Sequence, residues 1–199
     1  MDIYKKKQKK VRQEDHKNAQ PGDCYGYVAI KRDTKLHLAH TVGKRINTIA
    51  DHLIWKLSCI LSPPTFNYPL EIYTDGNPQY LPALLENFRK DCIVYGRLIK
   101  HKRAGKLIWK TKEQVLRCPK MEEIETTVIE NYNGILRERI SCLVRRTKCY
   151  SKRRERFDRH LDIFQGYNNL MKSENGKTPM MLEGKTSKIW RWEDFFMYR

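Results

Sequence analysis

The chain has 199 residues, of which 40% are hydrophobic and 11% aromatic, a composition that supports one folded domain and argues against disorder. Its 40 Lys and Arg residues against 23 Asp and Glu give a net charge of +17, which favours a polyanionic partner, first nucleic acid and second an anionic membrane surface. No apolar run approaches the roughly 20 residues of a transmembrane helix, and no signal-peptide core opens the chain, so the membrane is the weaker candidate.

Six cysteines are scattered through apolar or basic surroundings, and none forms a Cys-x-x-Cys pair. A zinc ribbon therefore has no support. We expect reduced, mostly buried cysteines of an intracellular protein.

Residues 1–20 carry seven Lys or Arg and are expected to be the end of a strand followed by a solvated basic loop. Periodicity then predicts six elements in the order strand, strand, helix, strand, helix, strand. They span residues 24–30, 36–42, 46–61, 70–74, 81–88 and 92–95. The first two strands form a hairpin, and the first helix ends before Pro63 and Pro64. This order predicts an α/β layer with hairpin and crossover connections.

His37 and His40 lie three residues apart on the second expected strand. Because side chains alternate along a strand, we expect these two on opposite faces and discount a metal shared between them. The six histidines include no His-x-x-x-His pair.

Residues 97–120 contain nine Lys or Arg and one acid, Glu113, while Leu107, Ile108 and Trp109 interrupt the charge. A basic segment with an aromatic residue inside it is typical of a surface that follows a DNA backbone. A solvated insertion explains the composition equally well. The candidate DNA-binding side chains here are Lys106, Lys110 and Lys112.

A long helix is expected from Glu122 onward. Apolar residues at a spacing of three or four form its buried stripe: Ile129, Tyr132, Leu136, Ile140 and Leu143. Four polar residues share a flank of this helix: Glu130, Asn133, Arg137 and Arg145. A further helix is expected to bury one side: Phe157, Leu161, Phe164 or Ile163, and Tyr167 or Asn168. The tail "IWRWEDFF" is interpreted as an aromatic cluster that docks on the body.

Asp75 follows the expected strand 70–74 and begins a Gly-Asn-Pro turn. It is either an ordinary turn aspartate or a metal-binding carboxylate at a sheet edge. A strand-end Asp and a helix Glu that converge in an α/β layer can hold Mg²⁺ beside DNA, because phosphoryl transfer uses hard oxygen ligands.

Two motifs in this order, "TDGNPQY" at 74–80 and "ENYNGILR" at 130–137, resemble the core of insertion-sequence DDE transposases, closest to the family-one type. The resemblance implies that Asp75 is the second catalytic Asp and Glu130 the catalytic Glu, with Asn133 and Arg137 beside it. "AIKRDTKLHLAHTVGKR" also resembles the hairpin between the family's first two acids, and "TPMMLEGKTSKIWRWEDF" its tail. The likeness covers nearly the whole chain.

The resemblance does not extend to the family's first catalytic Asp. In the family this Asp lies on the first strand, several residues before a Lys-rich end that resembles "KKKQKK". Here only four residues precede Lys5, and Asp2 falls too late to match the family position. The usual N-terminal module that reads DNA ends is also missing. We therefore expect the 3′ remnant of a longer transposase gene or the product of a downstream start.

The resemblance implies an RNase H-like fold, a mixed five-stranded sheet flanked by helices whose first strand would lack part of its length. The expected parts are 1–20 as the basic remnant, 21–172 as the catalytic core with its insertion 97–120, and 173–199 as the aromatic tail. The implied activity is metal-dependent strand cleavage and transfer, weak or absent here, with Mg²⁺ or Mn²⁺ held by Asp75 and Glu130.

The implied partners are element-end and target DNA and either a second copy or a full-length transposase, with no membrane, in the cytoplasm near the nucleoid. One rival is a non-catalytic DNA-binding regulator that interferes with full-length transposase. A second rival is a basic RNA-binding protein of ribosomal type, which would have no reason to bring Asp75 and Glu130 together.

Overall fold

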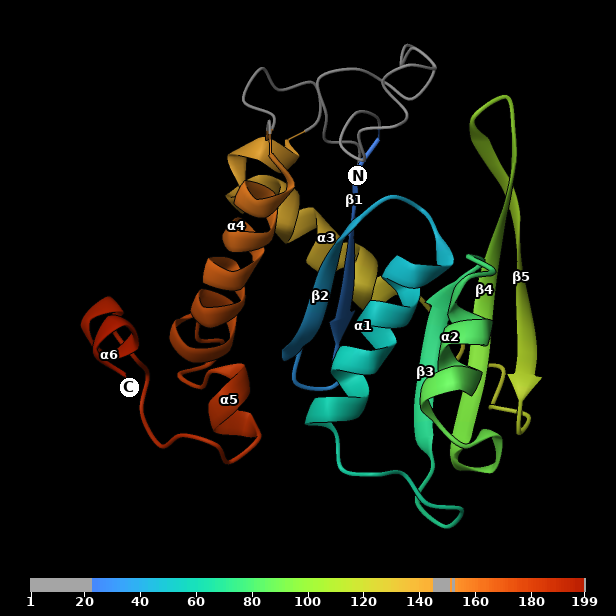
Figure 1. The fold of residues 1–199 in the computed structure, drawn as a ribbon, viewed down its shortest axis with the longest axis horizontal. Coiled ribbons are helices and arrows are strands. Elements are labelled where there is room, and N and C mark those ends of the chain that lie inside the picture. The colour runs from blue at the N-terminus through green and yellow to red at the C-terminus, as the bar shows by residue number, and fades with distance from the viewer. Residues whose placement is uncertain (1–22, 145–150, 152, 199) are drawn as a thin grey trace. The chain divides into compact units, whose positions relative to one another are not determined.

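The structure, a computed structural model, describes residues 23–144, 151 and 153–198. The chain divides into a central unit, residues 46–130, and a terminal unit, residues 1–45 and 131–199. Both units combine helices with strands (Figure 1), so the predicted mixed α/β class is confirmed. The predicted boundaries at residues 20 and 172 stay a prediction.

The central unit holds a three-stranded sheet with two helices and the beginning of a third. Its elements are α1 (Asn47–Ile60), β3 (Leu70–Asp75), α2 (Tyr80–Asn87), a 3-10 turn η3 (Lys90–Cys92), β4 (Ile93–Arg103), β5 (Lys106–Leu116) and the first turn of α3 (Thr127–Arg139). β3 pairs in parallel with β4, and β4 pairs antiparallel with β5. A crossover through α2 connects the parallel pair, as the sequence predicts.

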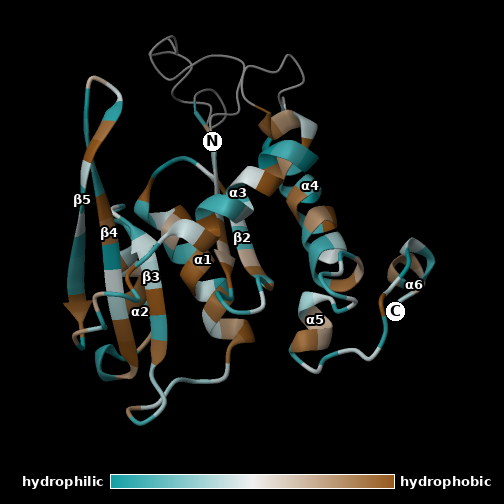
Figure 2. Ribbon diagram, turned by 180° about the vertical axis from the view of Figure 1, so that it is seen from behind, coloured by the Kyte–Doolittle hydropathy of each residue, from teal (hydrophilic) through white to brown (hydrophobic). Residues whose placement is uncertain are grey.

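α1 and α2 pack against each other through the apolar stripes expected from their periodicity. Five residues of α1 are buried: Ile49, Ala50, Leu53, Ile54 and Leu57. Ile46 and Ile60, which the same periodicity predicted to be buried near the two ends of the helix, are exposed instead. Asn87 Nδ2 donates to the carboxylate of Asp51 at 2.6 Å and ties the end of α2 to α1. Hydrophobic residues recur along α1 in Figure 2.

The hairpin of β4 and β5 extends beyond β3. β3 pairs with β4 only as far as Leu98, and the hairpin then continues as a two-stranded ribbon (Figure 1). We call residues 99–111 the distal ribbon. Ala104 (φ 51°) and Gly105 (φ 81°) form its two-residue turn, and positive φ at both positions is the geometry that suits strand twist.

The sequence did not predict this hairpin. The periodicity predicted that the fourth strand ends at Tyr95, and we interpreted residues 97–120 as a basic insertion. In the structure β4 continues to Arg103, and β5 runs back alongside it to Leu116. The charged residues in both strands hide the apolar alternation that would have indicated strands, because neither face of the distal ribbon is fully buried.

The terminal unit contains a two-stranded antiparallel hairpin and the helices of the C-terminal half. Its elements are β1 (Tyr25–Ile30), β2 (His37–Gly43), the rest of α3, a 3-10 turn η4 (Ser141–Leu143), α4 (Arg154–Gly166), a π-helical turn η5 (Tyr167–Met171), α5 (Pro179–Leu182) and α6 (Trp192–Met197). The predicted hairpin and the helix around Phe157 are confirmed.

Glycines let two helices approach closely in this unit. A Cβ on Gly26 of β1 would lie 2.9 Å from the ring of Phe157, so the absence of a side chain lets α4 pack onto the hairpin. A Cβ on Gly166 would lie 2.6 Å from the ring of Phe195. The aromatic tail therefore contacts the end of α4, and Trp192 stacks on Tyr167 with ring centroids 6.3 Å apart.

The prediction that His37 and His40 face opposite ways is wrong. His40 Nδ1 and His37 Nε2 lie 3.2 Å apart, and both rings are buried. The cause is a register shift in β2: Ala29 pairs with Ala39, but Ile30 pairs with His37, so Leu38 is an extra residue in the strand. A bulge of this kind interrupts the alternation of side chains.

The predicted five-stranded sheet is also wrong for the described residues. They contain five strands, but these form a two-stranded sheet, β1 and β2, and a three-stranded sheet, β3 to β5. No described strand pairs with the remaining edges of β1 and β3, and pairing is what makes a single sheet. The expected first strand, including Asp2, lies outside the described residues. An RNase H-like fold stays a prediction.

Candidate functional site

Asp75 is the last residue of β3 and is exposed. Its carboxylate accepts a hydrogen bond from the backbone N–H of Asn77 at 3.3 Å, the Asx-turn that the Gly-Asn-Pro sequence favours. The turn that the sequence predicts after Asp75 is therefore present. It leaves the carboxylate at the sheet edge, where the second interpretation requires it.

Glu130 lies in the first turn of α3, where a carboxylate is favoured by the helix dipole. Its Oε1 accepts hydrogen bonds from the ammonium of Lys100 on β4 and from the hydroxyl of Thr126. Partial burial raises the pKa of Glu130, but the hydrogen bonds from Lys100 and Thr126 and the charges of Lys100 and Lys110 outweigh burial and hold it below its ordinary value. Glu130 is therefore ionised at neutral pH.

Asp75 and Glu130 lie over the same face of the central sheet. Asp75 is in register with Leu98 of β4, and neighbouring residues in register direct their side chains to the same face. Lys100 follows Leu98 by two residues, about 7 Å along the strand, and shares that face. Since Lys100 contacts Glu130, strand pairing connects the two carboxylates through one lysine.

These residues do not fit a two-metal centre by themselves. Within residues 23–144, 151 and 153–198, no group of three or more His, Cys, Asp and Glu side chains could hold a metal ion. Mg²⁺ needs several oxygen ligands and is reluctant to lose water, whereas Glu130 is already neutralised by the ammonium of Lys100. A divalent cation would have to displace that ammonium.

The other residues predicted for DNA contact divide into four groups. Asn133 and Arg137 are half-buried on α3, and Arg145 lies outside the described residues. Lys112 donates to the carbonyl of Met121 at 2.9 Å, so its ammonium is already engaged. Two more residues, Lys106 and Lys110, are exposed on the distal ribbon.

One face of the distal ribbon is a lysine face, defined by Lys100, Lys102 and Lys110. Lys100 is the cross-strand partner of Lys110, and near the turn Arg103 is the partner of Lys106. Residues 99–111 contain five Lys or Arg and no Asp or Glu. The single acid of the segment 97–120, Glu113, pairs instead with Arg97 at 2.5 Å, below the ribbon.

The opposite face is an aromatic face, defined by Ile99, His101, Trp109 and Thr111. His101 and Trp109 are cross-strand partners, and their rings stack with centroids 4.8 Å apart and planes 19° apart. His101 Nε2 also lies 2.9 Å from the hydroxyl of Thr111. Trp109 remains 57% exposed. Figure 2 shows hydrophobic and hydrophilic residues side by side in this part of the hairpin.

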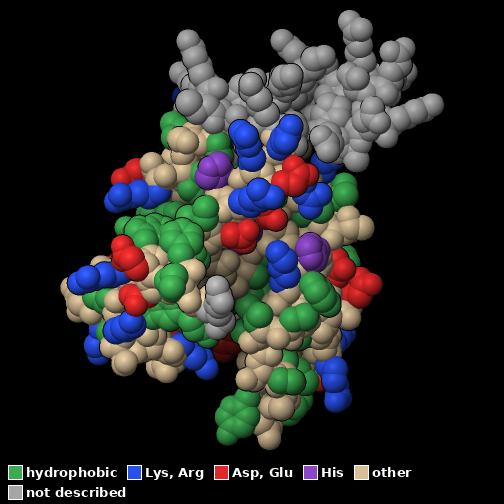
Figure 3. Space-filling model, turned by 60° about the vertical axis from the view of Figure 1, so that its left-hand side comes forward, with side chains coloured by type: hydrophobic (Ala, Val, Ile, Leu, Met, Phe, Trp, Pro, Cys, Tyr) green, Lys and Arg blue, Asp and Glu red, His purple; other side chains and the backbone are tan. Residues whose placement is uncertain are grey.

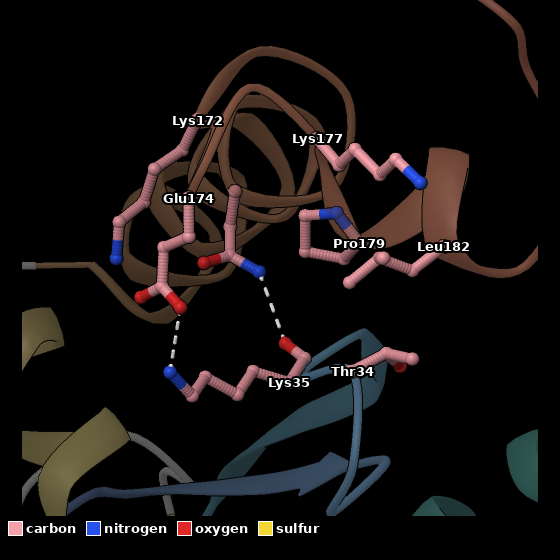
Figure 4. A pocket seen from close by; sticks show the side chains of 8 residues that line it. Thr34, Lys35, Lys172, Glu174, Lys177, Pro179 and Leu182 are labelled. Atoms are coloured by element: carbon pink, nitrogen blue, oxygen red, sulfur yellow. Dashed lines mark hydrogen bonds and ion pairs between the residues drawn. The ribbon is translucent and has the colours of Figure 1, made fainter.

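Charge is distributed differently on other described parts of the surface. On the face of the molecule in Figure 3, Lys and Arg side chains lie among Asp and Glu side chains rather than in an unbroken patch. A pocket in the terminal unit is lined by Lys35, Lys172 and Lys177, among others. However, Lys35 pairs with Glu174 at 2.7 Å, and Lys172 and Lys177 point away from each other (Figure 4). The pocket therefore offers an anion no converging set of ammonium groups.

Sequence reasoning missed Lys100, Thr126 and His101. The signal for His101 was available: a turn at Ala104 and Gly105 between two basic strands predicts a hairpin, and a hairpin places His101 near Trp109. Nothing local indicates that Lys100 contacts Glu130, because 30 residues separate them.

Comparisons with models of known protein families, with curated proteins and with solved structures gave no match to this chain. The transposase interpretation consequently depends on the two motifs and on the geometry of Asp75, Glu130 and the distal ribbon. Within the described part of the chain, no helix is long and apolar enough to cross a membrane.

Proposed function

We propose that this chain binds DNA through the distal ribbon, and that Asp75 and Glu130 are carboxylates of a DDE-type strand-transfer core with weak activity or none. Its partners would be element-end and target DNA and a second copy or a full-length transposase, near the nucleoid. Mg²⁺ or Mn²⁺ would bind weakly, in competition with Lys100.

The pairing of Lys100 with Lys110 carries the proposal. Like charges on opposite strands are destabilising, and a two-stranded ribbon is at best marginally stable by itself. Glu130 offsets part of this repulsion, but the rest of the lysine face has no acid within the ribbon. A polyanion such as DNA neutralises these charges, and neutralisation compensates for the lost stability.

Titration of labelled duplex DNA at several salt concentrations tests the proposal. Lys106→Ala combined with Lys110→Ala should weaken binding and lower the log–log salt slope by about 0.9 for each lost phosphate contact. The matched control, Lys172→Ala with Lys177→Ala, removes the same charge from the terminal unit and should leave the slope nearly unchanged. If both pairs behave alike, binding depends on net charge and the ribbon has no special role.

A second candidate function is a non-catalytic regulator that binds DNA and interferes with full-length transposase. The contact between Lys100 and Glu130 favours it, because this ion pair neutralises the carboxylate without a metal. A nicking and strand-transfer assay with Mg²⁺ or Mn²⁺ distinguishes the two. Activity that Asp75→Asn and Glu130→Gln abolish supports the enzyme, whereas intact DNA binding without activity supports the regulator.

A further inference from the structure

Trp109 presents an open aromatic surface on the distal ribbon. One side of its indole is covered by the imidazole of His101, and more than half of the side chain is in contact with solvent. The neighbouring residues Leu107 and Ile108 are 49% and 54% exposed. Of these, Leu107 is the cross-strand partner of Lys102 and so lies on the lysine face. Exposed apolar side chains on a charged hairpin are unfavourable in water, which indicates a binding surface.

From this arrangement we propose that the ribbon binds unpaired DNA, with a base stacked on Trp109 and the neighbouring phosphates on the lysine face. The inference depends on the proposed DNA binding and specifies its substrate. A nucleotide carries its base and its phosphate on different sides of the sugar. A single strand along the edge of the ribbon can therefore place a base over the aromatic face while its phosphates lie near Lys102 and Lys110.

Duplex DNA fits this surface less well. A ribbon that reads a major groove presents hydrogen-bonding side chains to the base edges, whereas the polar members of the aromatic face, His101 and Thr111, bond to each other. In a closed duplex the faces of the bases are covered by their neighbours. Stacking on a protein side chain thus needs an unpaired base, and such stacking is the usual way in which proteins hold single strands.

A membrane surface is the competing partner for exposed Leu, Ile and Trp beside lysines. The geometry disfavours it, because two of the four residues on the aromatic face are polar and hydrogen-bonded to each other. The flat stack of His101 and Trp109 also suits a planar base better than hydrocarbon chains. Anionic lipid vesicles are therefore one arm of the test.

The test compares single-stranded DNA, duplex DNA and RNA of the same sequence, and anionic vesicles, on the full chain. We expect single-stranded DNA to bind most tightly, and Trp109→Ala to weaken its binding roughly 5- to 150-fold, the range typical of losing one stacked base. Duplex binding should change much less. Trp109→Phe keeps a stacking ring and should restore most of the affinity for single strands.

Trp55 supplies a matched control. It also stacks on a histidine, His52, with centroids 5.6 Å apart, and is 51% exposed, but it lies on α1. Trp55→Ala should leave binding unchanged. Because Trp109→Ala could loosen the hairpin, tryptophan fluorescence gives a second measurement: single-stranded DNA should quench it in the wild type and in Trp55→Phe, and quench it less in Trp109→Phe.

Three results would overturn the inference while leaving DNA binding intact: equal binding of duplex and single strands, no effect of Trp109→Ala, or tighter binding of RNA. Preference for anionic vesicles, lost in Trp109→Ala, would assign the aromatic face to a membrane. No binding to any DNA would overturn both this inference and the proposed function.

Discussion

The ammonium of Lys100 on β4 donates a hydrogen bond to the carboxylate of Glu130 at the start of α3, across 30 residues of sequence. This contact joins the lysine face of the distal ribbon to the predicted catalytic carboxylate. It also puts an ammonium where a metal-dependent centre would require a divalent cation. Any ligand that attracts Lys100 leaves Glu130 with a charge that must be compensated by another group.

Replacing Lys100 tests this relationship. In Lys100→Met the pKa of Glu130 should rise, because the hydrogen bond and the charge of Lys100 help to hold it down. The ion pair stabilises the fold above the ordinary pKa of Glu, and this contribution disappears as the pH falls through the lowered pKa. The free energy of unfolding at neutral pH should drop by less than about 1 kcal/mol, since the pair is partly exposed. NMR titration of the carboxyl carbon measures the pKa, and an unchanged value would contradict the contact.

Replacing Lys110 should separate stability from binding. Lys110→Thr removes the charge opposite Lys100 and introduces a good β-former, so the free energy of unfolding should stay equal or rise by up to about 1 kcal/mol. DNA affinity should fall at the same time. Denaturant unfolding and a salt titration of DNA binding measure the two effects. Lys90→Thr, outside the ribbon, is the control, and a parallel loss of stability and affinity would argue against a functional lysine face.

His37 should make the terminal unit sensitive to acid. Burial, and secondly the neighbouring His40, lower the pKa of His37 to about 3, and its Nδ1 lies 2.9 Å from the hydroxyl of Tyr132. Below the ordinary pKa of His, about 6.5, the unfolded chain binds a proton that the folded chain does not. The contribution of His37 to the free energy of unfolding is therefore fully present above this pH. It decreases as the pH falls, by about 1.4 kcal/mol per pH unit.

His37→Gln should flatten that dependence between about pH 6 and pH 4, because only the unfolded-state titration of His37 is removed. The comparison uses the slope of the unfolding free energy against pH, so a constant loss of stability in the variant does not affect it. The groups facing this ring and its partner, namely His40, Asp158, Asp162 and Tyr132, are present in both proteins. Equal slopes would show that His37 is accessible to protons.

Two glycines should respond in opposite ways to the same substitution. A Cβ on Gly96 would lie 2.7 Å from Cγ1 of Ile124, so Gly96→Ala should destabilise the chain by roughly 1–3 kcal/mol through overpacking. A Cβ on Gly134 of α3 would meet no described heavy atom within 4 Å apart from its chain neighbours and the backbone of its own helix, and Gly134→Ala should stabilise the helix by about 0.5–1 kcal/mol. Thermal denaturation measures both. A stable Gly96→Ala variant would mean that the segment holding Ile124 does not cover the sheet.

Local sequence patterns predicted much of the secondary structure. The stripe of α1, the hairpin of β1 and β2, and the strand that ends at Asp75 each follow from residue spacing within one element. The buried side of α3 was also anticipated through Tyr132 and Leu136. Such predictions succeed because a helix or strand that buries one face repeats its apolar residues at its own period.

The relations between distant segments could not be predicted in this way. The bulge at Leu38 brings His37 and His40 together, and it is stabilised by Asn169, whose amide pairs with both the N–H and the carbonyl of His37. The length of β5 depends on its partner β4, because few of its own side chains are buried. Each of these features requires a partner far away in the sequence.

The sequence by itself determined the class of the fold, the basic character of residues 97–120, and the positions of Asp75 at a strand end and Glu130 on a helix. Only the tertiary structure decided that the strands form two sheets, that Lys100 and Lys110 lie on the face of a ribbon opposite Trp109, and that Lys100 neutralises Glu130. The physical reason is that periodicity reports which side of an element is buried, whereas strand pairing and ion pairs depend on the partner that tertiary folding brings alongside.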